Sequence, residues 1–184
     1  MVRIYTRKGD DGTTRLLFGG RVRKDAPVIE ANGAVDESQA ALGLARAEAE
    51  PGTELNELIV GLERDLWVLM AEVATAPQRR EKLRPGQSLV TLEMIVALEE
   101  RIDGLSERFD MPAGFVVPGQ NRVSAALDMA RTVVRRAERL LTRAPPAEDS
   151  LAVPYLNRLS DLLWTMARWQ EGEHLTARPG RRSG

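Results

Sequence analysis

The sequence contains no cysteine and only one histidine, His174, which lies close to the C-terminus. The absence of cysteine excludes disulfides, thiolate metal sites and cysteine nucleophiles. A single histidine cannot supply the paired Glu-x-x-His motifs of a di-iron bundle, nor a His-rich zinc site. A Ser-His-Asp triad would have to use His174, and no nucleophile-elbow motif accompanies it. We therefore expect His174 to be a surface residue.

Long apolar runs are also missing, because none approaches the roughly 20 residues needed to span a bilayer. Residues 1–5 have no apolar signal-peptide core, so we expect a cytoplasmic protein without membrane contact. The net charge of −1 gives no reason to expect nucleic-acid binding. Lysine occurs only at positions 8, 24 and 82. The abundance of arginine fits either a GC-rich coding sequence or phosphate recognition by particular arginines.

Beyond residue 25 the apolar residues recur with the period of an α-helix. The clearest helix covers residues 53–76, and its single apolar stripe consists of Leu55, Leu58, Ile59, Leu62, Leu66, Leu69, Met70 and Val73. The same pattern predicts helices over residues 28–50, 91–105, 122–143 and 154–173, separated by Pro/Gly-rich loops. Long helices without alternating strand patterns predict an all-α bundle. We expect one domain over residues 1–175, with a bundle over 26–175, and a disordered tail over 176–184.

The N-terminal segment, residues 1–25, combines glycines, threonines and cations. Its glycines allow backbone N–H groups to turn toward an anion, and they are Gly9, Gly12, Gly19 and Gly20. Hydroxyls and positive charge come from Thr6, Thr13, Thr14, Lys8, Arg15 and Lys24. The order fits neither a Walker A motif nor a dinucleotide fingerprint. Two interpretations remain open, a phosphate-binding loop and a plain hairpin that pairs residues 3–6 with 13–17.

Two of the expected helices carry rows of polar side chains. In the helix over 122–143, one face within about 100° bears Arg131, Arg135, Glu138 and Arg139. This row is either a solvated charge ridge or a positive patch suited to a triphosphate or a neighbouring carboxylate. In the helix over 154–173, Asn157 and Asp161 share a face, either as exposed polar positions or as hydrogen-bonding groups for a ribose or base. Trp164 and Trp169 are expected in the core or an interface.

Six segments, in this order, resemble the PduO-type ATP:cob(I)alamin adenosyltransferases, which attach the adenosyl group of ATP to the cobalt of vitamin B12. They are residues 5–14, 19–25, 35–37, 115–119, 131–139 and 155–161, within a resemblance that covers residues 3–170. Two departures lie beside the expected site and bear on substrate positioning. Gln120 stands where the family often has a second glycine, and Ser38-Gln39 stands where Leu-Asn is common.

The resemblance implies a five-helix bundle with ferritin-like up-and-down packing, assembled as a homotrimer with ATP bound between subunits. One subunit would hold the triphosphate through Thr6, Arg7, Lys8, Gly9, Thr14, Arg15 and Lys24. The other would hold the rest of the nucleotide through Arg135, Arg136, Glu138, Arg139 and Asn157. Asp36 and Arg131 would pair across the interface and, with Arg135 and Phe115, serve catalysis. Phe115 would lie beneath the corrin ring, and Asp161 would also contact cobalamin.

The implied substrates are ATP and cob(I)alamin, and the implied products are adenosylcobalamin and triphosphate. Cob(I)alamin is itself a strong nucleophile, so the reaction requires no protein base or nucleophile. Mg²⁺ would be held mainly by the phosphates, without dedicated protein ligands. A reductase and an adenosylcobalamin-dependent client enzyme are possible partners. Two alternatives remain, a non-catalytic ATP or cobalamin carrier or regulator, and a structural helical bundle. For Phe115 the alternative is a plug at the end of the bundle core.

Overall fold

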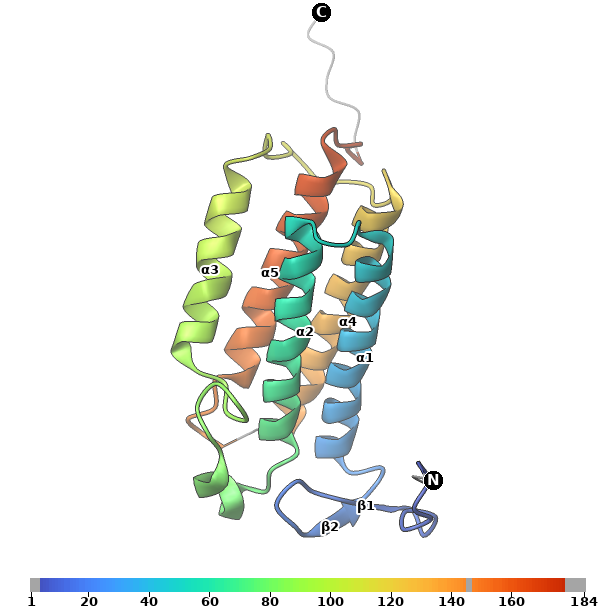
Figure 1. Ribbon diagram of the computed structural model, residues 1–184, viewed down its shortest axis with the longest axis vertical. Coiled ribbons are helices and arrows are strands. Elements are labelled where there is room, and N and C mark those ends of the chain that lie inside the picture. The colour runs from blue at the N-terminus through green and yellow to red at the C-terminus, as the bar shows by residue number, and fades with distance from the viewer. Residues whose placement is uncertain (1–3, 145–146, 178–184) are drawn as a thin grey trace, which may run out of the picture.

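The computed structural model describes residues 4–144 and 147–177. Its five α-helices are α1 (Pro27–Glu48), α2 (Glu54–Val73), α3 (Leu92–Ser106), α4 (Arg122–Arg143) and α5 (Ala152–Glu171). A 3₁₀ helix, η1 (Pro77–Lys82), and two short strands, β1 (Thr13–Arg15) and β2 (Arg21–Arg23), complete the fold. The mostly helical fold expected from the sequence is confirmed, and each α-helix begins and ends within three residues of its predicted bounds. Figure 1 shows the α-helices side by side.

The core lies between the helices, where α5 packs against α2, α3 and α4, and α1 packs against α2 and α4. The helix α1 contributes mostly small side chains to this core, namely Ala31, Ala34, Val35, Ser38, Ala41, Leu42 and Ala45. Small residues let the backbones of α1 and α4 approach closely. The start of α4 is fixed by a capping box, in which Asn121 Oδ1 accepts from the Ser124 amide at 2.8 Å. The cap fixes where α4 begins, and with it the positions of the charged side chains along this helix.

The N-terminal strands form an antiparallel pair in which Thr14 lies opposite Val22. Gly19 and Gly20 lie in the connecting turn with φ of 100° and 85°, a region that favours glycine. The alternative pairing of residues 3–6 with 13–17 is therefore wrong for the described residues, and Arg3 lies outside them. Because Gly19 and Gly20 follow β1, the chain reverses direction between β1 and β2 and not before β1. As a result, residues 5–12 form a loop over the hairpin.

The segment that follows α5 returns to pair with the loop before α4. Thr176 and Val116 form an antiparallel bridge, and the Ala177 amide donates to the Phe115 carbonyl at 2.7 Å. The Val117 amide donates to the Leu175 carbonyl, also at 2.7 Å. The expectation of disorder is thus wrong for Thr176 and Ala177, whose backbones find partners far away in sequence. Residues 178–184 of the expected tail lie outside the described residues.

The buried carboxylate of Glu72, near the C-terminal end of α2, connects three elements. Both oxygens of Glu72 are satisfied, by Arg80 Nη1 at 2.9 Å, Ser150 Oγ at 2.6 Å and the Val90 amide at 2.8 Å. A buried charge with this many donors is compensated, so Glu72 ties α2 to η1 and to the start of α5. None of the helices in the described part of the chain is long and apolar enough to cross a membrane.

Candidate functional site

A cavity of about 810 Å³ lies between the N-terminal loop and the hairpin. Its lining includes all seven residues expected to hold triphosphate, which are Thr6, Arg7, Lys8, Gly9, Thr14, Arg15 and Lys24. Tyr5, Asp10, Thr13, Gly20 and Arg21 complete the lining. The cavity therefore has five basic side chains and one acidic side chain on its wall. Such a wall favours a multiply charged anion.

The loop around this cavity is held in shape by Asp11 and Arg21. Asp11 Oδ1 accepts from the Thr13 amide at 3.0 Å and the Thr13 hydroxyl at 2.8 Å, and Arg21 Nη2 lies 3.1 Å from the same carboxylate. These donors, Thr13 first, hold the pKa of Asp11 below its ordinary value. Arg21 Nη2 also donates to the Lys8 carbonyl at 2.7 Å. Arg21 is thus used to shape the loop.

Other cations in the cavity are available for a ligand. The side chains of Lys8, Arg15 and Lys24 have no hydrogen-bond or ion-pair partner within residues 4–144 and 147–177. A Cβ at Gly9 would lie 3.2 Å from the Thr13 carbonyl oxygen and 3.2 Å from the end of the Lys24 side chain. Glycine at this position therefore lets the loop backbone approach β1 and the lysine. The loop brings backbone, hydroxyl and cationic groups to one cavity wall.

The arginine row on α4 is mostly exposed, and its members differ in what they contact. Arg139 Nη1 donates to the Arg135 carbonyl at 2.9 Å, and Arg136 forms an ion pair with Glu37 of α1. Asn157 Nδ2 donates to Glu138 Oε1 at 3.0 Å, which places the amide of α5 beside the row on α4. The structure therefore brings Asn157 of α5 beside Glu138 of α4, whereas Arg136 faces α1.

The predicted pair Asp36 and Arg131 is not formed within the chain. Asp36 is exposed on α1 and has no hydrogen-bond or ion-pair partner among the described residues. The Arg131 side chain is 27% exposed, and its Nε lies 3.2 Å from Asp128 Oδ1 on the same helix. Pairing of Asp36 with Arg131 across a subunit boundary stays a prediction.

A second cavity, of about 590 Å³, surrounds the loop before α4. The loop supplies Pro112, Ala113, Gly114, Phe115, Val116 and Pro118, and the helices supply Asp128, Arg131, Trp164 and Arg168. Phe115 is 91% exposed. The alternative in which Phe115 plugs the core is therefore wrong, because the ring projects from the chain instead of packing inside it. An exposed aromatic ring held at a cavity is suited to contact a flat apolar ligand.

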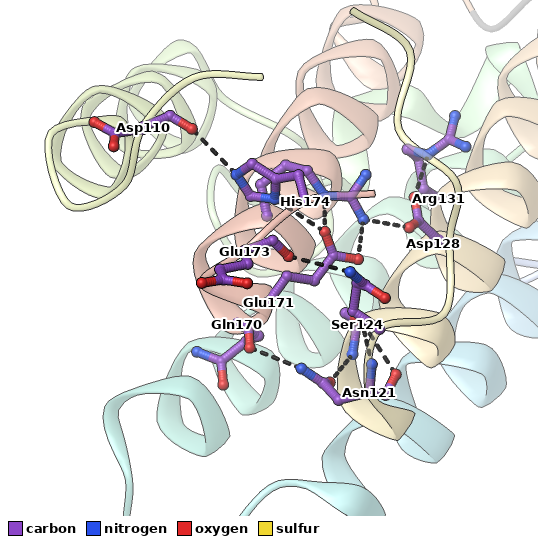
Figure 2. Close-up of polar contacts among 11 residues, drawn as sticks. Asp110, Asn121, Ser124, Asp128, Arg131, Gln170, Glu171, Glu173 and His174 are labelled. Atoms are coloured by element: carbon purple, nitrogen blue, oxygen red, sulfur yellow. Dashed lines mark hydrogen bonds and ion pairs between the residues drawn. The ribbon is translucent and has the colours of Figure 1, made fainter. Parts of the chain in front are cut away.

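A buried charge network lies behind this second cavity, and Figure 2 shows its contacts. Arg168, which is 1% exposed, donates from Nη2 to Asp128 Oδ2 at 2.6 Å and to Glu171 Oε1 at 2.8 Å. The Arg168 guanidinium also lies 5.7 Å from the centre of the Trp164 ring. With Arg131 on the outer side, two arginines and two carboxylates share the network. The charges therefore balance in the interior.

His174 extends the network and is not the surface residue expected from the sequence. Its side chain is 9% exposed, and Nδ1 lies 3.2 Å from Glu171 Oε2. Nε2 lies 3.1 Å from the Asp110 carbonyl oxygen, and the ring stands edge-on to Phe109 with 6.0 Å between centroids. The imidazole is held inside by its contact with the buried Glu171 carboxylate. No local sequence pattern indicates this contact. His174 thereby connects the end of α5 to the loop after α3.

Asp161 does not line the cavity around Phe115. It pairs with Arg158 Nη1 at 2.9 Å, and Arg158 Nε reaches Glu99 Oε1 at 3.0 Å. Its predicted contact with cobalamin stays a prediction. Conversely, sequence analysis missed Asp128 and Arg168. Asp128 lies three residues before Arg131, and Arg168 lies seven residues, about two helical turns, after Asp161. This spacing places each of them on the face of a predicted polar row, and it is the signal that could have found them.

The two cavities lie at different levels of the molecule. Figure 1 shows the hairpin at the end where α4 finishes and the loop between α3 and α4 at the opposite end. Leu16 and Val22 of the hairpin line a pocket together with Ala144, which directly follows α4. Arg131, at the second cavity, lies 13 residues before Ala144, or roughly 20 Å along a helix axis. Within one chain, the contact of the hairpin with Ala144 and the second cavity are thus separated by more than half the length of α4.

No group of three or more His, Cys, Asp or Glu side chains that could hold a metal ion occurs in the described ranges 4–144 and 147–177. The cations and hydroxyls of the N-terminal cavity are suited to hydrogen bonds with phosphate oxygens.

Comparison with known proteins gives one consistent result. The family model described as cobalamin adenosyltransferase matches residues 4–170. A corrinoid adenosyltransferase of Citrobacter freundii is 42% identical over 176 residues, covering 93% of this chain and 96% of the relative. A corrinoid adenosyltransferase of Mycobacterium tuberculosis is 36% identical over 197 residues, covering 96% of this chain and 97% of the relative. The chain spans 50% of the longer corrinoid adenosyltransferase PduO of Citrobacter freundii, at 37% identity.

The fold is also similar to solved structures. A variant PduO-type ATP:corrinoid adenosyltransferase from Lactobacillus reuteri, in complex with cobalamin and ATP, superposes with a TM-score of 0.85 at 27% identity. That match covers 96% of this chain and 100% of the other.

Proposed function

Because this chain belongs to the cobalamin adenosyltransferase family, we propose that it transfers the 5′-deoxyadenosyl group of ATP to the cobalt of cob(I)alamin. The observation that carries this proposal is the N-terminal cavity, whose wall includes all seven residues expected to hold triphosphate. The wall has five basic side chains and one acidic side chain, so its net positive charge favours a polyphosphate over a neutral ligand.

The reaction is a displacement at C5′ of ATP. The cobalt–carbon bond forms while the C5′–oxygen bond breaks, and the electron pair of that bond leaves with the triphosphate. Positive side chains such as Lys8, Arg15 and Lys24 stabilise the negative charge that gathers on the leaving group. The protein otherwise acts by holding two substrates in line. This displacement requires no thiol and no imidazole at the reacting atoms.

The separation of the two cavities supports a site shared between subunits. In ATP, C5′ is one ester oxygen away from the α-phosphate, so triphosphate and cobalt must come close together. A single chain offers its triphosphate cavity at the hairpin and its Phe115 cavity beside Arg131. The contact of the hairpin with Ala144 lies roughly 20 Å from Arg131 along α4. We therefore assign the triphosphate to the N-terminal loop of one subunit and the cobalamin to Phe115 of its neighbour. The expected homotrimer, with Asp36 and Arg131 paired at its interface, meets this requirement.

In this arrangement α4 and α5 of the neighbour complete the nucleotide site. Their contribution consists of Arg135, Arg136, Glu138, Arg139 and Asn157, among which Asn157 contacts Glu138 and Arg139 contacts Arg135. We further propose that residues 1–175 act as one domain, in which residues 1–25 bind nucleotide and the five helices of 26–175 form a ferritin-like bundle. Phe115 then lies beneath the corrin ring, and Asp161 contacts another part of cobalamin.

Magnesium accompanies ATP in this proposal, held mainly by the phosphate oxygens. When bound, it supplies charge neutralisation to the triphosphate, and Thr6, Thr14 and Lys24 of the cavity orient the phosphates around it. A reductase that supplies cob(I)alamin and a client enzyme that accepts adenosylcobalamin are the further expected partners. The cytoplasmic location expected from the sequence also stays a prediction.

The test is incubation with ATP, Mg²⁺ and chemically reduced cobalamin, followed by absorbance and by phosphate analysis. We expect adenosylcobalamin and triphosphate in equal amounts. Lys8→Ala should slow the reaction strongly, whereas the matched control Lys82→Ala, an exposed lysine on η1 outside the cavity, should not. Binding without conversion would identify a carrier, and ADP plus phosphate as stoichiometric products would identify an ATPase. Either result overturns the proposal.

A further inference from the structure

We propose that Asp128 is a positioning residue, which fixes the orientation of Arg131 and thereby the reactivity of the site; the effect on turnover rests on the proposed function. Asp128 does not itself contact a substrate in this proposal. It acts through one guanidinium, and it is held in place by another. The geometry of the buried network supports this role.

Each oxygen of the Asp128 carboxylate is assigned to a different arginine. Oδ2 accepts from Arg168 Nη2 at 2.6 Å, and Oδ1 lies 3.2 Å from Arg131 Nε. Asp128 is 4% exposed, so water does not compete for these positions. The carboxylate is therefore a bridge between a fully buried arginine and one that reaches the surface.

Arg168 provides the rigid support for this bridge. Its guanidinium is fixed on three sides, by Asp128, by Glu171 and by the Trp164 ring at 5.7 Å. His174 holds Glu171 from behind, with Nδ1 3.2 Å from Oε2. A carboxylate paired to such a fixed cation has little freedom to rotate, so Oδ1 presents a stationary acceptor to Arg131.

The contact with Asp128 can orient Arg131 because it uses Nε of the guanidinium. Asp128 binds Nε of the Arg131 guanidinium, and neither Nη group has a hydrogen-bond or ion-pair partner among the described residues. Arg131 lines the cavity around Phe115 while Asp36 lies exposed on α1. The two Nη groups are thus available for the cavity or for a carboxylate of a second copy. Without Asp128, an arginine side chain on a helix surface would sample several rotamers.

The substitution that tests this is Asp128→Asn, which keeps size and shape. An amide keeps one acceptor oxygen and replaces the other by an NH₂ group that only donates, so it can accept at the position of Arg168 or at that of Arg131 but not at both. Since Arg168 is the more deeply buried, we expect the amide oxygen of the variant side chain to stay with Arg168 and Arg131 to be released. We expect kcat to fall about 10- to 100-fold, in line with misplacement of a site group, while KM for ATP stays within a few-fold. The matched control is Asp149→Asn, an exposed carboxylate paired to Arg80.

The discriminating measurement is the same substitution in an Arg131→Lys background. Lysine has no Nε–Nη fork and cannot bind Asp128 and an outward group in the same geometry. If Asp128 acts through Arg131, Asp128→Asn should change kcat less than twofold in that background. An equal fold-loss in both backgrounds, or unchanged kcat in the single variant, would overturn the proposal. If the asparagine variant melts below the assay temperature, Asp128→Glu replaces it, because it keeps the charge but moves the carboxylate by one methylene.

A readout independent of turnover separates this proposal from the proposed function. In arginine-labelled protein, the Nε–H of Arg131 should exchange slowly with solvent in the wild type and quickly in Asp128→Asn, as followed by NMR. Slow exchange in both would refute the role of Asp128 whatever the enzyme activity. Wild-type protein that shows the expected exchange pattern but converts no cob(I)alamin would refute the proposed function alone.

Discussion

The exposure of Phe115 permits a sharp prediction for Phe115→Ala. A buried phenylalanine typically costs about 3–5 kcal/mol when replaced by alanine. Phe115 is 91% exposed, so about a tenth of that contact is lost, or less than about 0.5 kcal/mol. For a chain of 184 residues this corresponds to a change in Tm of about 1–2 °C. We therefore expect the variant to fold and melt almost as the wild type does.

The effect on chemistry should be large in comparison. If the ring lies beneath the corrin, it excludes water and the lower ligand of cobalt, and the four-coordinate state is easier to reduce. Phe115→Ala should then abolish the four-coordinate cob(II)alamin signal in the presence of ATP, as measured by absorbance and EPR. Turnover that starts from cob(II) should suffer more than turnover with chemically supplied cob(I). The control is Trp67→Ala, since Trp67 is another exposed aromatic residue and lies on α2, outside the cavity.

Two results would refute this reasoning. A normal four-coordinate spectrum in Phe115→Ala would show that the ring does not displace the lower ligand. A loss of several kcal/mol in stability would show that the ring packs in a contact that the single chain does not reveal, such as a subunit interface. Melting and spectra measured on the same sample separate these cases.

Three further predictions concern other parts of the molecule. Arg135→Ala should lower turnover about 10²–10³-fold without changing melting, because the side chain is exposed; activity within twofold of wild type would mean a solvated ridge. Asp36→Asn should weaken both activity and assembly measured by sedimentation, and strictly additive effects with Arg131→Ala would show that the two do not interact. Burial raises the pKa of Asp65 above its ordinary 3.8 despite the hydrogen bond from Tyr155. The contribution of Asp65 to stability is therefore greatest below pH 3.8 and falls as pH rises through the raised pKa of the folded state. Asp65→Asn should therefore melt higher than wild type at about pH 7 and equally at about pH 3; a difference independent of pH would contradict this.

The helices could be predicted because their signal is local. The stripe in α2 repeats over five turns, and each repeat adds to the same conclusion. The hairpin could not be predicted in the same way, since strands of three residues carry too little pattern. Its register depends on Gly19 and Gly20, whose positive φ is visible only in the folded chain. Likewise, the bridge between Val116 and Thr176 joins segments about 60 residues apart, and no composition rule links them.

The residues that line the N-terminal cavity were easier to identify from the sequence than the partners of individual side chains. The seven residues of the N-terminal cavity were identified because one short loop contains most of them. The partners of the α4 arginines depend on which helix lies opposite, which periodicity alone does not give. For that reason the ion pair of Arg136 with Glu37 could not be predicted, and the expected contact of Arg136 with the nucleotide stays a prediction. For the same reason the buried Arg168 was overlooked, although its spacing from Asp161 continues a polar row.

The neighbouring positions Asp36 and Glu37 have different surroundings within the chain. Glu37 is used inside the chain, where it pairs with Arg136 and ties α1 to α4. Asp36 is exposed and has no hydrogen-bond or ion-pair partner within the described chain. On α4 the same division separates Arg136 from Arg131, whose Nε is bound by Asp128 while its Nη groups are not. A helix turns by about 100° per residue, so adjacent charges point to different surroundings. Glu37 and Arg136 therefore hold the chain together, whereas Asp36 and the Nη groups of Arg131 stay available for their predicted pairing across two copies of the chain.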